Sequence, residues 1–214
     1  MSSSIVSVKN LTVRRGSNIV VDDVSFDLLP ESDTALVGPN GAGKSSLVAA
    51  LFGLIPRLSG DITIMGSKMN QSGYLPRSVR DKISYIPQNI YFQGQFPLSV
   101  FEFVQLGLGN GFNFLRNLDS RSKSAVYRAL ERTDTIELRR RLLSELSCGE
   151  LKRVMLAFSI VRPRDLLVLD EVQAGLDIPS TQRFQKMLLE LRRQEGWTVP
   201  VSYTHLRAHE TKSY

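Results

Sequence analysis

Hydrophobic and polar residues alternate near the start of the chain, in short runs such as IVSV, LTVRR and NIVVDDVSFDLL within residues 5–29. Alternation with a period of two is typical of strands with one buried face, so this stretch predicts antiparallel strands. GDITIMG, from Gly60 to Gly66, alternates in the same way between two glycines and predicts another strand.

Three apolar runs predict buried strands. ISYI at Ile83–Ile86 ends at Pro87, and LLVL at Leu166–Leu169 ends in two carboxylates. Residues 34–37 carry no formal charge and lead into a glycine-rich turn, so the chain from Val37 to Phe52 predicts a strand, a loop and a helix.

The pattern becomes helical from Ser99 to about Ser144, and again from Leu151 to Val161. A further helix over about Ser180–Gln194 follows from apolar residues at i, i+3, i+4 and i+7, beginning at Phe184. Strands that alternate with helices predict an α/β fold with a mostly parallel sheet and an all-helical insertion in the middle.

Composition narrows the class of protein. The 214 residues are 42% hydrophobic, which is enough for a sizeable core, and no apolar run reaches the roughly 18 residues of a membrane span. The start, MSSSIVSVKN, shows no signal-peptide pattern, and the single cysteine, Cys148, suits a reducing compartment. The formal charge of +6 is compatible with anionic partners, but a solvated surface is the simpler interpretation.

GPNGAGKS, from Gly38 to Ser45, fits the phosphate-binding loop G-x-x-x-x-G-K-[ST]. Its glycines let successive N–H groups turn toward phosphate oxygens. Lys44 is expected to reach the terminal phosphates, and Ser45 offers a hydroxyl to Mg²⁺. The predicted strand before this loop and the helix after it supply the context that the motif requires.

Three further motifs hold candidate residues. LLVLDE ends in Asp170 and Glu171, of which one can support Mg²⁺ and the other can polarise an attacking water. In YIPQN, Gln88 follows a strand and can bridge Mg²⁺ and water, or belong to a simple turn. In LSCGE, Ser147 can cap a helix or help that helix bind a phosphate, and the sequence leaves both roles open.

The order of these motifs, followed by AGLD, resembles the ATPase subunit of ABC transporters over nearly the whole chain up to about Val199. The resemblance implies an α/β P-loop core with an antiparallel β-subdomain and an α-helical subdomain at about residues 90–160. In that family two ATPase domains pair head to tail, as a homodimer or a mixed pair. Each ATP then lies between the P-loop of one domain and the signature helix of the other.

The resemblance also assigns roles residue by residue. Glu171 becomes the general base, Gln88 the sensor of the γ-phosphate, and Lys44 a catalytic phosphate ligand. Ser45, Gln88 and Asp170 become the ligands of Mg²⁺. The implied nucleotide contacts are Arg15, Gly38, Pro39, Asn40, Gly41, Ala42, Gly43, Lys44, Ser45 and Ser46, with Ser147, Gly149 and Asp177 acting across the dimer.

The stretch YIPQNIYFQGQFPLSVFEFVQLG is similar to the zinc and manganese importer branch of this family. That branch implies membrane permease subunits, an extracytoplasmic metal-binding protein, a place on the cytoplasmic face of the membrane and no nucleic-acid partner. An iron-chelate importer, a non-transport ABC ATPase and a nucleotide-binding fragment without full turnover are the alternatives.

Several positions depart from the family pattern, among them Cys148 and Arg15. Cys148 replaces a glycine of the usual LSGGQ or LSGGE signature, and Arg15 stands where an aromatic residue usually stacks on adenine. An arginine can stack there through its guanidinium, with less selectivity. Neither change removes a catalytic group.

Residues 200–214 lie beyond the stretch that resembles the family. VSYTHLRAHET, from Val201 to Thr211, is similar to the translation of a transposon adapter used in sequencing libraries. We therefore expect the ATPase domain to span residues 1–199, residues 200–214 to be a non-native tail, and His205 not to be a true switch histidine. Pro200 would also interrupt the core strand that the family carries here.

Overall fold

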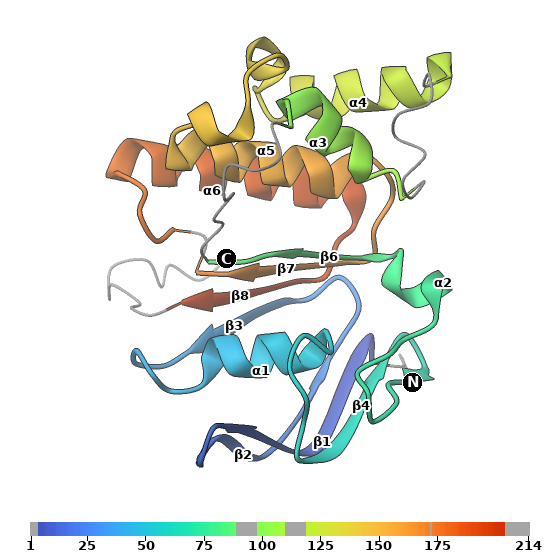
Figure 1. Ribbon diagram of the computed structural model, residues 1–214, viewed down its shortest axis with the longest axis vertical. Helices are drawn as coiled ribbons and strands as arrows, with labels where there is room; N and C mark the ends of the chain where they lie inside the picture. Colours follow the sequence, from blue (N-terminus) through green and yellow to red (C-terminus); the bar gives the residue numbers. More distant parts are fainter. Residues whose placement is uncertain (1–3, 89–97, 110–118, 172, 204–214) are drawn as a thin grey trace. The chain divides into compact units, whose positions relative to one another are not determined.

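The computed structural model describes residues 4–88, 98–109, 119–171 and 173–203. The chain divides into two units. Unit 1 holds residues 1–80, 168–171 and 198–214, and unit 2 holds residues 81–167 and 172–197. Strands dominate unit 1, and helices dominate unit 2 (Figure 1). The predicted fold class, α/β with an antiparallel sheet and a helical part, is confirmed.

An antiparallel sheet begins unit 1, with the strand order β2-β1-β4-β5. Its strands are β1 (Val6–Arg15), β2 (Asn18–Leu28), β4 (Ser59–Ile64) and β5 (Ser67–Lys68). The buried residues of β1 are Val6 and Val8 at even positions and then Leu11 and Val13 at odd positions, and the register with β2 shifts between Val8 and Leu11. An extra residue in the strand keeps apolar side chains facing one core across this irregularity.

Parallel strands form the rest of the β-structure in unit 1. They are β3 (Asp33–Val37), β8 (Val199–Tyr203) and the end of β7 (Leu166–Asp170). β8 pairs in parallel with β3 on one side and with β7 on the other. Pro200 lies opposite Thr34 inside β8, whereas the pairing with β7 begins at Val201. The strand therefore forms through the proline, at a position with one described strand partner.

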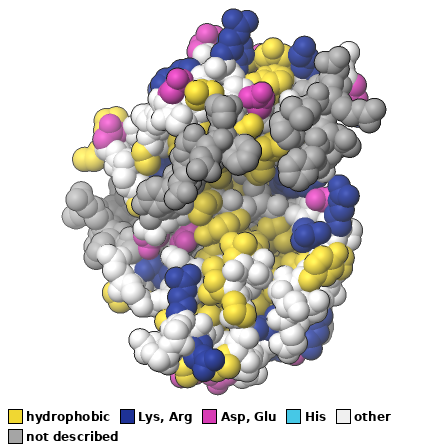
Figure 2. Space-filling view, in the orientation of Figure 1, with side chains coloured by type: hydrophobic (Ala, Val, Ile, Leu, Met, Phe, Trp, Pro, Cys, Tyr) yellow, Lys and Arg dark blue, Asp and Glu magenta, His cyan; other side chains and the backbone are white. Residues whose placement is uncertain are grey.

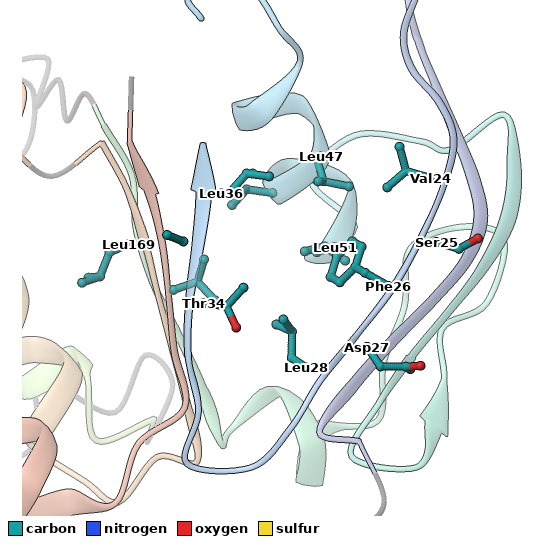
Figure 3. A pocket seen from close by; sticks show the side chains of 13 residues that line it. Val24, Ser25, Phe26, Asp27, Leu28, Thr34, Leu36, Leu47, Leu51 and Leu169 are labelled. Carbon is teal, nitrogen blue, oxygen red and sulfur yellow. The ribbon is translucent and has the colours of Figure 1, made fainter. Parts of the chain in front are cut away.

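Two short helices also belong to unit 1: α1 (Lys44–Leu51) and α2 (Arg77–Arg80). An apolar groove of about 290 Å³ lies between α1, β2 and β3 (Figure 3). Phe26 and Leu28 of β2 point into the groove, whereas Ser25 and Asp27 point away from it. β2 and β3 are each the last strand of their sheet, so two sheet edges border the groove.

Unit 2 is built around one helix. Its elements are β6 (Ile83–Ile86), α3 (Val100–Leu106), α4 (Ser120–Arg132), the 3₁₀ helices η2 (Ile136–Leu138) and η3 (Leu143–Glu145), α5 (Cys148–Ile160) and α6 (Ile178–Glu195). α5 contacts α3, α4, α6 and β6. Phe103 of α3 stacks on Phe158 of α5, with ring centroids 5.0 Å apart. α5 is thus the core helix of this unit.

Two arginines, the buried Arg164 and the half-buried Arg162, tie the start of unit 2 to its helices. Arg164 donates to the carbonyl oxygens of Asp81 and Gly107, and burial lowers its pKa to about 10. Arg162 forms an ion pair with the Asp81 carboxylate at 3.0 Å. A charged group as deeply buried as Arg164 requires partners, so its two hydrogen bonds hold the chain that leads into β6.

The predicted helix over Ser180–Gln194 begins two residues earlier, at Ile178, because Asp177 caps it and Pro179 fits its first turn. Gly196 ends the helix in a left-handed conformation. Within the described ranges, no helix combines the length and apolar character needed to cross a membrane.

Candidate functional site

The loop between β3 and α1 has the geometry of an anion cradle. Gly41 and Gly43 both adopt positive φ, at 82° and 85°. Gly43 is the N-cap of α1 and, having no side chain, makes no capping hydrogen bond to the first amides of the helix. Helix N-termini with open N–H groups attract anions.

Gly43 also brings the loop against the antiparallel sheet. A Cβ atom at this position would overlap the carbonyl oxygen of Val20 in β2. Only glycine satisfies both the close approach and the positive φ. Arg15 is the last residue of β1 and pairs with Asn18, the first residue of β2, across the turn between the two strands. Its side chain is exposed.

Lys44 is buried, with 6% of its surface exposed. Its Nζ donates to the carbonyl oxygens of Gly38 and Pro39, at 2.8 and 2.9 Å, and lies 3.5 Å from Oε1 of Glu171. These acceptors satisfy the ammonium inside the loop. A phosphate that replaced them would gain a charge-assisted contact with the same cation.

Ser45 and Asp170 bring two oxygen ligands together. The Ser45 hydroxyl donates to Oδ1 of Asp170 at 3.3 Å, and Asp170 is buried to 2% exposure at the end of β7. A hydroxyl beside a carboxylate is a donor set that suits Mg²⁺, which prefers oxygen ligands and keeps several waters. The residues present therefore fit a magnesium ion.

Glu171 follows β7 with a strained backbone. Its φ is 45°, in the left-handed region that residues other than glycine rarely occupy. Its carboxylate is mostly buried beside Lys44. Strain of this kind persists only where the surrounding structure holds it, and it is frequent at functional sites.

The other predicted residues belong to unit 2. Ser147 is the N-cap of α5, where its hydroxyl accepts from Glu150 N and the Glu150 carboxylate accepts from Ser147 N. The capping role is thus observed, while a phosphate role for Ser147 stays a prediction. The Ser147 backbone hydrogen bond lowers the pKa of Glu150, and the Arg141 guanidinium lies 3.2 Å away.

Three further residues of unit 2 complete the predicted set. Gly149 lies in the first turn of α5, where a Cβ would meet Ser180 Oγ at 3.5 Å. Gln88 follows β6. Asp177 caps α6 by accepting from Ser180 N at 2.7 Å. Hydrogen bonding to the side chain and to the backbone of Ser180 lowers the pKa of Asp177. The structure places Lys44, Ser45, Asp170 and Glu171 together. Gly149, Gln88 and Asp177 are described only by their surroundings within unit 2.

Two features lay beyond the sequence reasoning. One is the positive φ of Glu171, which no residue pattern signals. The other is Lys152, which is buried and donates to the carbonyl oxygen of Ala174 at 2.5 Å. The sequence does place Lys152 among the apolar residues of a predicted helix. Because lysine is seldom buried without a specific partner, that position could have indicated a buried hydrogen bond.

Comparison with known proteins gives concordant results. Residues 21–174 match the family model described as ABC transporter. The chain is 31% identical over 209 residues to the manganese transport system ATP-binding protein MntB of Listeria innocua, covering 98% of this chain and 83% of that protein. It is 35% identical over 199 residues to the zinc import ATP-binding protein ZnuC of Alcanivorax borkumensis, covering 93% and 68%.

A solved structure is similar along the same length. CbiO1 from Clostridium perfringens, part of the ABC transporter complex cbiONQ, matches with a TM-score of 0.76 and 26% identity. The alignment covers 94% of this chain and 79% of that one.

Proposed function

The chain belongs to the ABC transporter family, and from this premise we propose that it powers the import of manganese or zinc ions by hydrolysing ATP. As a member of this family the chain binds ATP and is the ATPase subunit of a transporter. The cargo is inferred from relatives whose names specify manganese and zinc, at 31 and 35% identity.

One observation carries the catalytic proposal: Lys44, Ser45, Asp170 and Glu171 meet beside the N-terminus of α1. A cation, a hydroxyl, a buried carboxylate and a second carboxylate are the groups that phosphoryl transfer to water requires. The apolar groove of unit 1 is a separate feature, because none of residues 38–45 lines it.

The mechanism rests on positioning and charge. The amides of residues 41–46 bind the phosphates, while Lys44 leaves the carbonyls of Gly38 and Pro39 and contacts the terminal phosphates. Ser45 and Asp170 would hold Mg²⁺, which supplies charge neutralisation on the phosphate oxygens. Glu171 orients the attacking water and accepts its proton.

The assembly is proposed from the family pattern. Two ATPase domains pair head to tail, with Ser147 and Gly149 contributing to the partner's nucleotide and Asp177 lying at the interface. Arg15 stacks on the adenine, and Gln88 adds a Mg²⁺ contact that reports on the γ-phosphate. Permease subunits in the membrane and an extracytoplasmic metal-binding protein complete the importer, which places this chain at the cytoplasmic face.

The domain boundaries are also a proposal. The ATPase domain spans residues 1–199, with a helical subdomain at about 90–160. Residues 200–214 are a non-native tail, of which Val201 to Thr211 resembles a translated adapter. The formation of strand β8 neither supports nor opposes a non-native origin of residues 200–214, because parallel pairing uses backbone groups that most sequences supply. A genomic read that kept codons 200–214 in their native context would contradict the adapter origin.

Replacing Glu171 by glutamine tests the catalytic assignment. Glu171→Gln keeps the shape of the side chain and removes the base, so we expect ATP hydrolysis to fall by about a hundredfold or more while nucleotide binding persists. Phosphate release and the binding of a fluorescent ATP analogue measure the two properties. Glu137→Gln is the matched control, since that side chain is 90% exposed in a 3₁₀ helix.

Hydrolysis by Glu171→Gln at the parent rate would refute the role of Glu171. Nucleotide binding without any hydrolysis by the parent would favour a binding module. The cargo is tested by uptake of radioactive manganese, zinc or an iron chelate into cells that express the chain with the permease of its operon. Uptake of only the iron chelate would overturn the metal-ion assignment.

A further inference from the structure

Residues 173–176, shortly after Glu171 in the chain, form a tight turn. Leu176 N donates to the carbonyl oxygen of Gln173 at 3.2 Å, and Gly175 has a φ of 77° at the third position of the turn. A positive φ at this position is the mark of a type II turn, in which the central peptide is flipped relative to a type I turn. The direction of the Ala174 carbonyl therefore distinguishes the two turn types.

Lys152 binds that carbonyl. Its side chain leaves the first half of α5 and is 3% exposed, and its Nζ donates to Ala174 O at 2.5 Å. The Sγ atom of Cys148, one helical turn earlier, lies 4.0 Å from the same oxygen. It also lies 3.5 Å from where a Cβ on Gly175 would stand. One face of α5 thus holds the turn through an ammonium and packs against it through a sulfur atom.

Keeping a lysine in this place has an energetic cost. Burial lowers the pKa of Lys152, because the charged form loses its hydration. A hydrocarbon side chain of similar length would fill the same space without that cost. What the ammonium adds is a directed hydrogen bond to one carbonyl, which favours one orientation of the turn.

We propose that Lys152 is a positioning residue for the general base: by holding the Ala174 carbonyl it fixes the turn after Glu171 and so the backbone from which the carboxylate projects. Glu171 is joined to Ala174 through only two residues, and its positive φ requires support from neighbouring structure. This inference rests on the proposed role of Glu171.

The test removes the ammonium and, separately, the turn geometry. Lys152→Met keeps an unbranched side chain of similar length, and Gly175→Ala penalises the positive φ of the same turn. We expect each to lower kcat about tenfold with KM for ATP changed less than twofold, because misplacing a catalytic group slows the reaction more than it weakens binding. The double variant should be no slower than either single variant. Lys186→Met, at an exposed lysine of α6, is the matched control.

Amide hydrogen exchange measures the stability of this turn independently of ATP hydrolysis. In Lys152→Met the amides of residues 174–176 should exchange about tenfold faster, and those of α4 should keep the parent rates. Lys152→Arg, which retains charge and donors, should restore slow exchange and most of kcat.

Unchanged exchange in Lys152→Met would overturn the inference, even if the chain proved inactive. Faster exchange with parental kcat would overturn it as well, since the turn would then not position the base. An equal fall in kcat and in ATP affinity would indicate general destabilisation and would also contradict it. The proposed function fails differently, through a Glu171→Gln variant that hydrolyses ATP at the parent rate.

Discussion

At the scale of single residues, the sequence predicts which groups meet better than it predicts how they are held. GPNGAGKS and LLVLDE indicate that Lys44, Ser45, Asp170 and Glu171 share one place, and the structure pairs Lys44 with Glu171 and Ser45 with Asp170. Motif spacing does not encode the left-handed φ of Glu171 or the bond between Lys152 and Ala174, because both depend on how segments distant in sequence pack. Their functional roles stay predictions until the variants are measured.

Gly43 provides a stability test at this scale. Gly43→Ala should lower the free energy of unfolding by about 2 kcal/mol or more, because the methyl group adds a clash with Val20 O to the strain of a positive φ. Urea denaturation measures the loss. Gly41→Ala is the control: its φ is 82° but a Cβ there meets no atom within 4 Å, so only the conformational cost of about 1 kcal/mol should appear. Equal losses would show that the approach to Val20 is unimportant.

At the scale of elements, boundaries follow from local chemistry where a cap or a turn residue is present. The buried strand Ile83–Ile86 is predicted and observed with the same limits, and α5 begins directly after its predicted cap. The start of α6 at Ile178 could have been predicted from Asp177 and Pro179, whereas periodicity alone placed it too late. Pairing partners are less accessible, since nothing in the sequence of β8 specifies that it lies between β3 and β7.

The cap of α5 predicts a pH dependence. The pKa of Glu150 is lowered in the folded state, chiefly by the hydrogen bond from Ser147 N, so the unfolded chain takes up this proton first as the pH falls. The stabilisation by Glu150 is therefore complete at neutral pH and is lost as the pH drops through its folded pKa. Glu150→Gln should lower the melting temperature at pH 7 and show a smaller further loss between pH 6 and pH 3 than the parent.

Ser147→Ala is the partner variant for this experiment. It should destabilise the fold by about 1 kcal/mol at neutral pH through loss of the hydroxyl acceptor, and leave the Ser147 backbone hydrogen bond to Glu150 in place. Identical pH slopes in the parent and in Glu150→Gln would show that the carboxylate contributes nothing to the cap.

At the scale of the molecule, charge and apolar surface are unevenly distributed. Unit 2 carries most of the net positive charge of the chain. Figure 2 shows hydrophobic side chains gathered over the part of unit 1 that carries α1. The sequence predicts both sheets, but it does not reveal that β2 and β3 end them on either side of one apolar groove. That arrangement depends on the order of strands in space.

The two edges make a prediction for nucleotide-free protein. Unprotected edge strands beside apolar surface favour pairing between molecules, so the chain should self-associate as its concentration rises. Ala35→Lys introduces a charge on the exposed part of β3 and should shift the onset to roughly tenfold higher concentration. Light scattering measures the onset. Ser25→Lys, whose side chain points away from the groove, should match the parent (Figure 3), and an equal shift in both variants would indicate a net-charge effect only.

The contacts of Lys44 have a consequence for which anions the loop accepts. Because Gly38, Pro39 and Glu171 already surround the ammonium, an incoming anion competes with internal acceptors instead of filling a vacant charge. Chloride or acetate carries a single negative charge and offers little advantage over those acceptors. A polyphosphate with several adjacent negative oxygens does. We therefore expect the loop to favour polyphosphates over the small monovalent anions of the cell, because only a polyphosphate brings enough negative charge to displace the internal acceptors.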